Sequence, residues 1–153
     1  MPITGPLTHI DISIGYPEKS IPFYHAFFEA LGYRRWKVAM PEWQEPNPSR
    51  ATWGLKYADG TGFGVEVRPA RPDRRDRQYD RYAPGPHHLA FHAESREVVQ
   101  RVYRAMLEIG ATVLDPPADY SGQPGYDKGY YAVFFADPDG VKLEVAYIPS
   151  ANP

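Results

Sequence analysis

The sequence predicts an α+β fold in which two βαβββ modules form one cup-shaped mixed sheet around a cleft. The first observation is a pair of strands that each begin with a histidine, His9 and His88. The second is a pair of later strands that each carry one glutamate, Glu66 in FGVEVRP and Glu144 in VKLEVAY. The third is the spacing, because 57 residues separate His from Glu in the first half and 56 in the second. Such a repeat indicates one supersecondary unit used twice within a single domain of residues 1–153.

Module one covers about residues 5–68 and opens with a strand in which isoleucines alternate with polar residues. A helix follows, because apolar residues then recur every three or four positions until Gly32 ends the pattern. Its predicted buried positions are Ile21, Tyr24, Phe27, Phe28 and Leu31. Strands are predicted over residues 33–38, 53–60 and 63–69, with a proline-rich loop over 40–48. His25, within the helix, is interpreted as an ordinary surface or boundary residue.

Residues 69–86 form the predicted linker between the modules, because this stretch is rich in proline and charge. From Arg68 to Pro86 the chain carries six Arg and three Asp. One interpretation is an anion site for a carboxylate, a phosphate or a coenzyme. The other is a solvated connection whose charges pair with one another. Arg68 lies on the same strand face as Glu66 and is predicted to contact the substrate.

Module two covers about residues 87–148 and repeats the order of module one. Its helix is predicted to start at Ser95, which can cap it, and to end at Gly110. The predicted buried positions of this helix are Val98, Val102, Met106 and Ile109. Residues 115–129 are predicted to be one long loop, which either recognises the substrate through Tyr120, Gln123 and Tyr126 or is a plain surface loop. The stretch Gly129–Ile148 predicts a hairpin, since alternating strands flank a Pro/Gly/Asp cluster at 137–140.

Strand alternation places the paired His and Glu residues on the faces turned away from the helices. Leu89 and Phe91 oppose His88, and Leu143 and Val145 oppose Glu144. Helices covering the apolar faces would leave the His and Glu side chains of both modules free to converge in one cleft. By the same parity His87 is assigned to the core or an interface. His92 shares the face of His88, so it either reaches the cleft or is a structural histidine.

The composition is that of an ordinary globular protein, with 42% hydrophobic and 24% charged residues and a net charge of −2. The chain lacks the excess of basic residues that would indicate nucleic acid binding. It also lacks a long apolar run or a leader-like segment that would indicate a membrane or export, so a cytoplasmic location is expected. The chain has no cysteine, so a metal would have to be held by His and carboxylate. Two imidazoles and two carboxylates suit Ni, Co, Zn, Mn or Fe with positions left for water or substrate.

The double βαβββ pattern and the motifs THIDI, GPHHLAFHA and FFADPDGVKLEVAY resemble the vicinal oxygen chelate superfamily over roughly residues 5–148. That superfamily includes glyoxalase I, bleomycin resistance proteins and extradiol dioxygenases. The resemblance implies that His9, Glu66, His88 and Glu144 bind a divalent metal. Glutamate at position 66 is similar to the bacterial glyoxalase I pattern, in which a metal-bound glutamate is the base.

The resemblance therefore implies a metal-dependent isomerase or lyase acting on a small oxygenated substrate. In such an enzyme the metal stabilises an enediolate while Glu66 or Glu144 removes and returns a proton. Ala70 stands where an Asn that helps hold glutathione would be expected, which argues against glutathione as a cosubstrate. The alternatives are an extradiol-type ring-cleaving dioxygenase and a metal-free, antibiotic-binding protein. The resemblance also implies a homodimer, with the four ligands drawn from one chain or from two.

Overall fold

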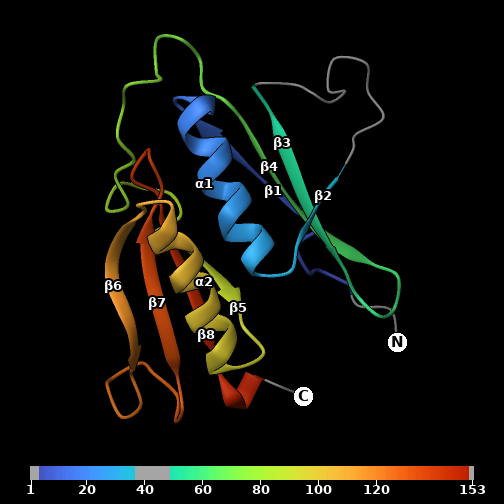
Figure 1. Ribbon diagram of the computed structural model, residues 1–153, viewed down its shortest axis with the longest axis vertical. Coiled ribbons are helices and arrows are strands. Elements are labelled where there is room, and N and C mark those ends of the chain that lie inside the picture. Colours follow the sequence, from blue (N-terminus) through green and yellow to red (C-terminus); the bar gives the residue numbers. More distant parts are fainter. Residues whose placement is uncertain (1–3, 37–48, 152–153) are drawn as a thin grey trace. The chain divides into compact units, whose positions relative to one another are not determined.

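The computed structural model describes residues 4–36 and 49–151 (Figure 1). The chain divides into two compact units, Met1–Arg77 and Gln78–Pro153. The division falls inside the predicted linker, and each unit contains one βαβββ module. The predicted loop over residues 40–48 and the end of the strand predicted over 33–38 lie outside the described residues.

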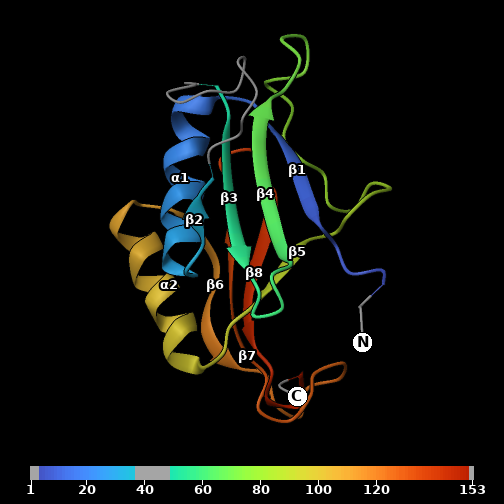
Figure 2. The ribbon, with the colours of Figure 1, turned by 90° about the vertical axis from the view of Figure 1, so that its right-hand side faces the viewer.

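The first unit is a four-stranded mixed sheet with one helix on one face (Figure 2). Its elements are β1 (His9–Ile14), α1 (Pro17–Ala30), β2 (Arg34–Arg35), β3 (Ala51–Lys56) and β4 (Gly62–Pro69). The strand order is β1-β4-β3-β2, with β1 and β4 parallel and the other pairs antiparallel. The first and last strands of the module are therefore neighbours, which brings the His-bearing strand beside the Glu-bearing strand.

The second unit has the same topology. Its elements are β5 (Leu89–His92), α2 (Arg96–Glu108), β6 (Thr112–Asp119), β7 (Tyr131–Ala136), β8 (Lys142–Tyr147) and a short 3-10 helix, η2 (Pro149–Ala151). The strand order is β5-β8-β7-β6, and β5 is parallel to β8. Two sheets with one strand order confirm the predicted duplication and the α+β class.

Each helix packs its apolar stripe on its own sheet. In the first unit Tyr24 and Phe28 of α1 are buried beside Trp53, which is only 1% exposed, with ring centroids 6.4 and 5.5 Å from that of Trp53. In the second unit Ser95 caps α2 by accepting a hydrogen bond from the backbone N–H of Val98. Because each helix covers one face of its sheet, the opposite face is left to the polar residues that alternate with the buried apolar residues along the strands.

On the face of the first sheet opposite α1, the Trp36 ring lies directly on glycine. A Cβ atom added to Gly54 would stand 1.7 Å from Trp36 Cε2, and one added to Gly64 would stand 3.4 Å from Trp36 Cζ3. Because Gly64 is two residues before Glu66, this indole lies on the face that carries the predicted site. Glycine is required at position 54 because any side chain there would displace the ring.

The β7–β8 hairpin is confirmed, and its turn is held by a buried aspartate. Asp137 is 4% exposed, and its Oδ1 accepts hydrogen bonds from the backbone N–H groups of Asp139 (2.9 Å) and Val141 (2.7 Å). Gly140 has φ +90°, a conformation that disfavours other residues. The Asp-Pro-Asp-Gly sequence thus fixes the register in which Phe134 pairs with Glu144.

Two predictions about the secondary structure and burial of β6 and α2 are wrong. The stretch predicted as a loop from residue 115 is a strand as far as Asp119, because β6 is an edge strand with two register shifts and so accommodates Pro116 and Pro117. Ile109 is 46% exposed instead of buried, because α2 ends at Glu108 and leaves Ile109 as its C-cap.

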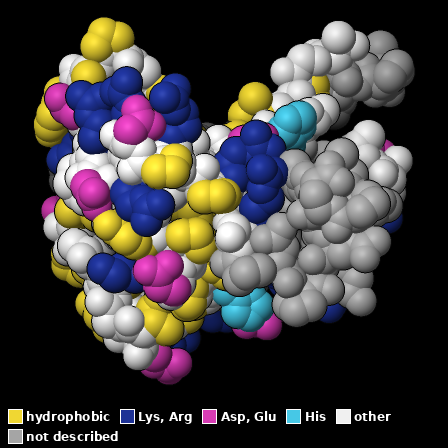
Figure 3. Space-filling view, turned by 90° about the horizontal axis from the view of Figure 1, so that it is seen from above, with side chains coloured by type: hydrophobic (Ala, Val, Ile, Leu, Met, Phe, Trp, Pro, Cys, Tyr) yellow, Lys and Arg dark blue, Asp and Glu magenta, His cyan; other side chains and the backbone are white. Residues whose placement is uncertain are grey.

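The Arg-rich linker pairs charges internally, as one of its two interpretations predicts. Asp73 accepts from Arg71 Nε at 3.2 Å and from Arg74 Nε at 3.3 Å, and Tyr16 donates to Asp76. Figure 3 shows Lys and Arg side chains lying among Asp and Glu side chains on one face of the molecule. Across residues 4–36 and 49–151, neither helix has the length and apolar character needed to cross a bilayer.

Candidate metal and substrate site

In the second unit the predicted pair His88 and Glu144 is in direct contact. His88 immediately precedes β5, and Glu144 lies in the middle of β8, where it pairs with Ala90. His88 Nε2 is 2.9 Å from Glu144 Oε2. The Glu144 side chain is 4% exposed and that of His88 is 33% exposed. A buried carboxylate is costly unless it is paired or binds a metal, so this contact supports the inference that Glu144 has a function.

The other Glu144 oxygen accepts a hydrogen bond from the Tyr130 hydroxyl. Burial and this hydrogen bond raise the pKa of Tyr130, which keeps the phenol protonated. Tyr130 packs on the buried cluster formed by Ala132, Phe134 and Ala146. Glu144 is therefore enclosed by aromatic and small side chains.

The hydrogen bonds suit one arrangement of protons in a neutral histidine pair. Both Glu144 oxygens accept, so Nε2 of His88 carries the hydrogen and its Nδ1 accepts. His87 Nδ1 is 2.8 Å from His88 Nδ1 and is the donor. Partial desolvation lowers the pKa of His87. His87 is exposed, so the core is wrong as its predicted place, and an interface stays a prediction.

In the first unit His9 and Glu66 share a sheet face. The parallel register pairs His9 with Gly64 and Asp11 with Glu66, so all four positions point to one side. The Glu66 side chain is 9% exposed, and its Oε1 accepts from Arg68 Nε at 3.0 Å, with Arg50 Nη1 at 3.8 Å. His9 Nδ1 is 3.0 Å from the Thr8 hydroxyl oxygen, which leaves Nε2 as the other ring donor or acceptor.

The donor chemistry of both pairs fits a divalent ion. Two ligands about 2.1 Å from one ion at a right angle stand about 3 Å apart, close to the 2.9 Å between His88 Nε2 and Glu144 Oε2. Binding through Nε2 would require the other tautomer of His88, with the hydrogen on Nδ1, and His87 Nδ1 would then be the acceptor. In the part of the chain that the structure describes, no three His, Asp or Glu side chains are gathered as a metal cluster. Each unit contributes one imidazole and one carboxylate of the predicted set.

The predicted substrate residues lie beside these carboxylates. Besides its contact with Glu66, Arg68 has its Nη2 3.7 Å from Asp11 Oδ2 and is partly exposed. Tyr120 and Tyr126 stack with ring centroids 5.1 Å apart, and Tyr126 meets Tyr130 edge-on at 4.8 Å. The two predicted tyrosines thus support the ring that holds Glu144.

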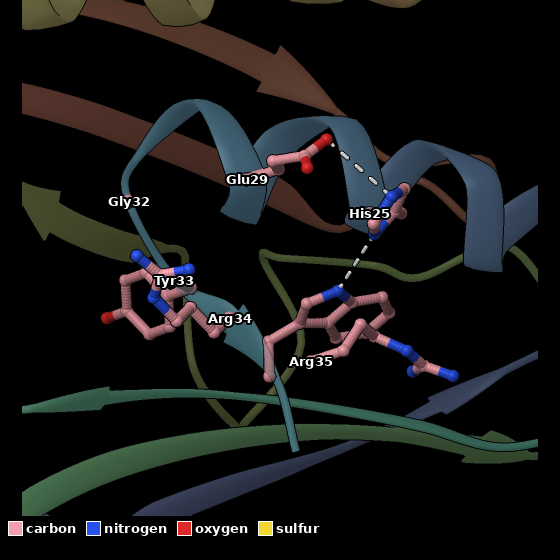
Figure 4. Close-up of a pocket in the computed structure, with 7 residues that line it drawn as sticks. His25, Glu29, Gly32, Tyr33, Arg34 and Arg35 are labelled. Carbon is pink, nitrogen blue, oxygen red and sulfur yellow. Dashed lines mark hydrogen bonds and ion pairs between the residues drawn. The ribbon is translucent and has the colours of Figure 1, made fainter. Parts of the chain in front are cut away.

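A separate pocket of about 340 Å³ lies on the α1 side of the first sheet (Figure 4). Its lining residues are His25, Glu29, Gly32, Tyr33, Arg34, Arg35 and Trp53. His25 Nδ1 accepts a hydrogen bond from Trp53 Nε1 at 3.3 Å, and His25 Nε2 is 3.6 Å from Glu29. None of the predicted site residues lines this pocket, and His25 is the exposed surface residue that the sequence predicted.

Tyr130 and Arg50 were missed as partners of the two carboxylates. The sequence does contain a signal for Tyr130, because Tyr130 and Phe134 lie an even number of residues apart and therefore share a strand face. Phe134 pairs with Glu144, so that face is the one that carries Glu144. In the same way, Arg50 is two residues before Thr52, which pairs with Glu66, so Arg50 lies on the strand face of Glu66.

The chain belongs to the Glyoxalase/Bleomycin resistance protein/Dioxygenase superfamily, whose family model matches residues 7–145. It is 31% identical over 137 residues to the uncharacterized protein YqjT of Bacillus subtilis (strain 168), with 90% of this chain and 94% of YqjT covered. It is similar to the crystal structure of a proposed glyoxalase from Bacillus halodurans at 25% identity and TM-score 0.68, covering 94% of this chain and 96% of that chain. A glyoxalase/dioxygenase from Nostoc punctiforme shares the fold at 18% identity and TM-score 0.67, covering 94% and 91%. These comparisons confirm the superfamily inferred from the motifs.

Proposed function

We propose that the protein is a divalent-metal-dependent enzyme of the glyoxalase type, an isomerase or lyase for a small substrate with a carbonyl or hydroxy-carbonyl group. The observation that carries the proposal is the buried Glu144 in contact with His88, together with a second His and buried Glu on one face of the first sheet. The proposal requires His9, Glu66, His88 and Glu144 to reach one ion, whether from one chain or from the two chains of a homodimer.

The ion would polarise a substrate oxygen and stabilise the negative charge that develops when a proton leaves the adjacent carbon. Glu66 is the better candidate for the base, because its Oε1 is engaged by the partly exposed Arg68, which can move to a substrate anion. Glu144 is more firmly held, since each of its oxygens has its own hydrogen-bond partner, His88 or Tyr130. In this proposal Glu66 moves the proton and Glu144 stays in place.

A metal-free small-molecule binding protein is the second candidate. Each buried carboxylate already has partners in the protein, Arg68 and Arg50 for Glu66, and Tyr130 and His88 for Glu144. These partners can stabilise the charges without an ion. Metal content of protein purified without chelator separates the two candidates. If stripped and metal-loaded protein bind small ligands equally well, the enzyme proposal is lost.

Replacing Glu66 by Gln is expected to stop proton transfer while weakening metal binding only in part. The amide has no basic oxygen, whereas three of the four proposed ligands remain. Exchange of the carbon-bound hydrogens of hydroxyacetone with deuterated solvent, measured by NMR, should fall by about 100-fold or more. Glu29→Gln, the same change on the exposed surface of α1, should leave exchange unchanged. Equal exchange in Glu66→Gln and the parent protein would remove Glu66 from the mechanism.

A further inference from the structure

We propose that Tyr130 is a positioning residue that holds one oxygen of Glu144, so that Glu144 presents only its other oxygen to an ion. This inference rests on the proposed metal site and extends it to a residue outside the ligand set. Its basis is the hydrogen bond from the Tyr130 hydroxyl to Glu144 Oε1, while Oε2 is 2.9 Å from His88 Nε2. Each carboxylate oxygen therefore has its own partner.

Tyr130 is itself held from several sides. Its backbone N–H donates to the carbonyl of Asp127 at 3.1 Å, and its carbonyl accepts from the N–H of Tyr120 at 2.9 Å. Its ring packs on the cluster containing Phe134 and meets Tyr126 edge-on. A side chain fixed at both backbone and ring can fix another, so the phenol restricts rotation of the Glu144 carboxylate.

The consequence is a ligand of defined geometry. While Oε1 accepts from Tyr130, rotation of the carboxylate is restricted, and Oε2 is the oxygen that Glu144 presents to an ion. Oε2 is also the oxygen that already lies beside the imidazole nitrogen of His88. The loss of this support is expected to weaken metal binding even though Tyr130 does not contact the ion.

The two units hold their carboxylates with different chemistry. Glu66 is approached by two guanidinium groups, those of Arg68 and Arg50, which offset its charge. Tyr130 is a neutral donor, so Glu144 keeps its full negative charge for an ion. This difference fits Glu144 as the permanent ligand and Glu66 as the group that exchanges partners during a reaction.

The test is Tyr130→Phe, which keeps the ring and its packing and removes the hydroxyl. Calorimetric titration of the stripped protein with Co²⁺ should show an affinity about 10- to 100-fold lower than that of the parent. The matched control is Tyr131→Phe, the adjacent phenol on the opposite strand face, which bonds Gln100. That variant should bind Co²⁺ with the parent affinity. Equal affinity for Tyr130→Phe and the parent, or an equal loss in both variants, would overturn the proposal.

A second readout does not depend on metal binding. In stripped protein, the ring ¹⁵N and proton resonances of His88 should shift in Tyr130→Phe, because a released carboxylate changes its contact with Nε2, and should stay in place in Tyr131→Phe. If the parent protein binds no metal, the proposed function fails, and these resonances alone decide the role of Tyr130. Unshifted His88 resonances in Tyr130→Phe would then refute it.

Discussion

Glu144→Gln is expected to lower the affinity for Co²⁺ or Zn²⁺ by about 100-fold or more, which exceeds the effect expected for any partner of the ligands. The amide lacks the negative charge that binds the ion. It also turns a group that accepts two hydrogen bonds into one that accepts through a single oxygen, so either Tyr130 or His88 faces an N–H group. An unsatisfied donor at this buried position should also lower the free energy of unfolding by about 1–3 kcal/mol.

Calorimetric titration and urea unfolding measure the two effects of Glu144→Gln. Glu108→Gln is the matched control, because it makes the same chemical change at the exposed end of α2. It should change neither quantity. Undiminished metal affinity in Glu144→Gln would show that Glu144 is not a ligand, whatever the effect on stability.

Trp53→Ala is expected to lower the free energy of unfolding by about 3–5 kcal/mol, because it removes the largest buried side chain of the first unit. The Trp53 ring lies 5.5 Å from Phe28 and 6.4 Å from Tyr24, and the guanidinium carbon of Arg35 stands 4.9 Å from its centroid. Its N–H also bonds His25 (Figure 4). The loss is comparable with the whole stability of a small domain.

Urea unfolding followed by circular dichroism measures the change, and hydrogen exchange locates it. Amide protection should fall most in β3, β4 and α1. Leu107→Ala, which truncates a side chain that is 49% exposed on α2, should cost less than about 1 kcal/mol. A Trp53→Ala protein as stable as the parent would contradict the packing described for the first unit.

The sequence predicted the features that depend on local periodicity. The hairpin of β7 and β8 was predictable because its alternation is strict and Asp137 to Gly140 supply turn chemistry. The duplication was predictable because the interval between His and Glu differs by one residue between halves. Together these features predicted the βαβββ order of each unit and the sheet face of all four proposed ligands.

Features that depend on neighbours distant in sequence were not predictable. The two prolines in β6 imply a loop by themselves, and only the edge position of that strand explains them. Trp36 lies on Gly54 and Gly64 because strand pairing brings them together, which no local pattern indicates. In the same way, the contact of Tyr130 with Glu144 spans 14 residues and depends on the register of the hairpin.

X-ray absorption at the cobalt edge of Co²⁺-loaded protein tests the central claim most directly. The account predicts one bound ion per set of four ligands. Its spectrum should show scattering from two imidazoles, and all other ligands should be oxygen atoms. His9→Ala and His88→Ala should each remove one imidazole contribution. A bound ion without imidazole scattering, or a spectrum unchanged by both substitutions, would contradict the claim that these His and Glu pairs form one metal site.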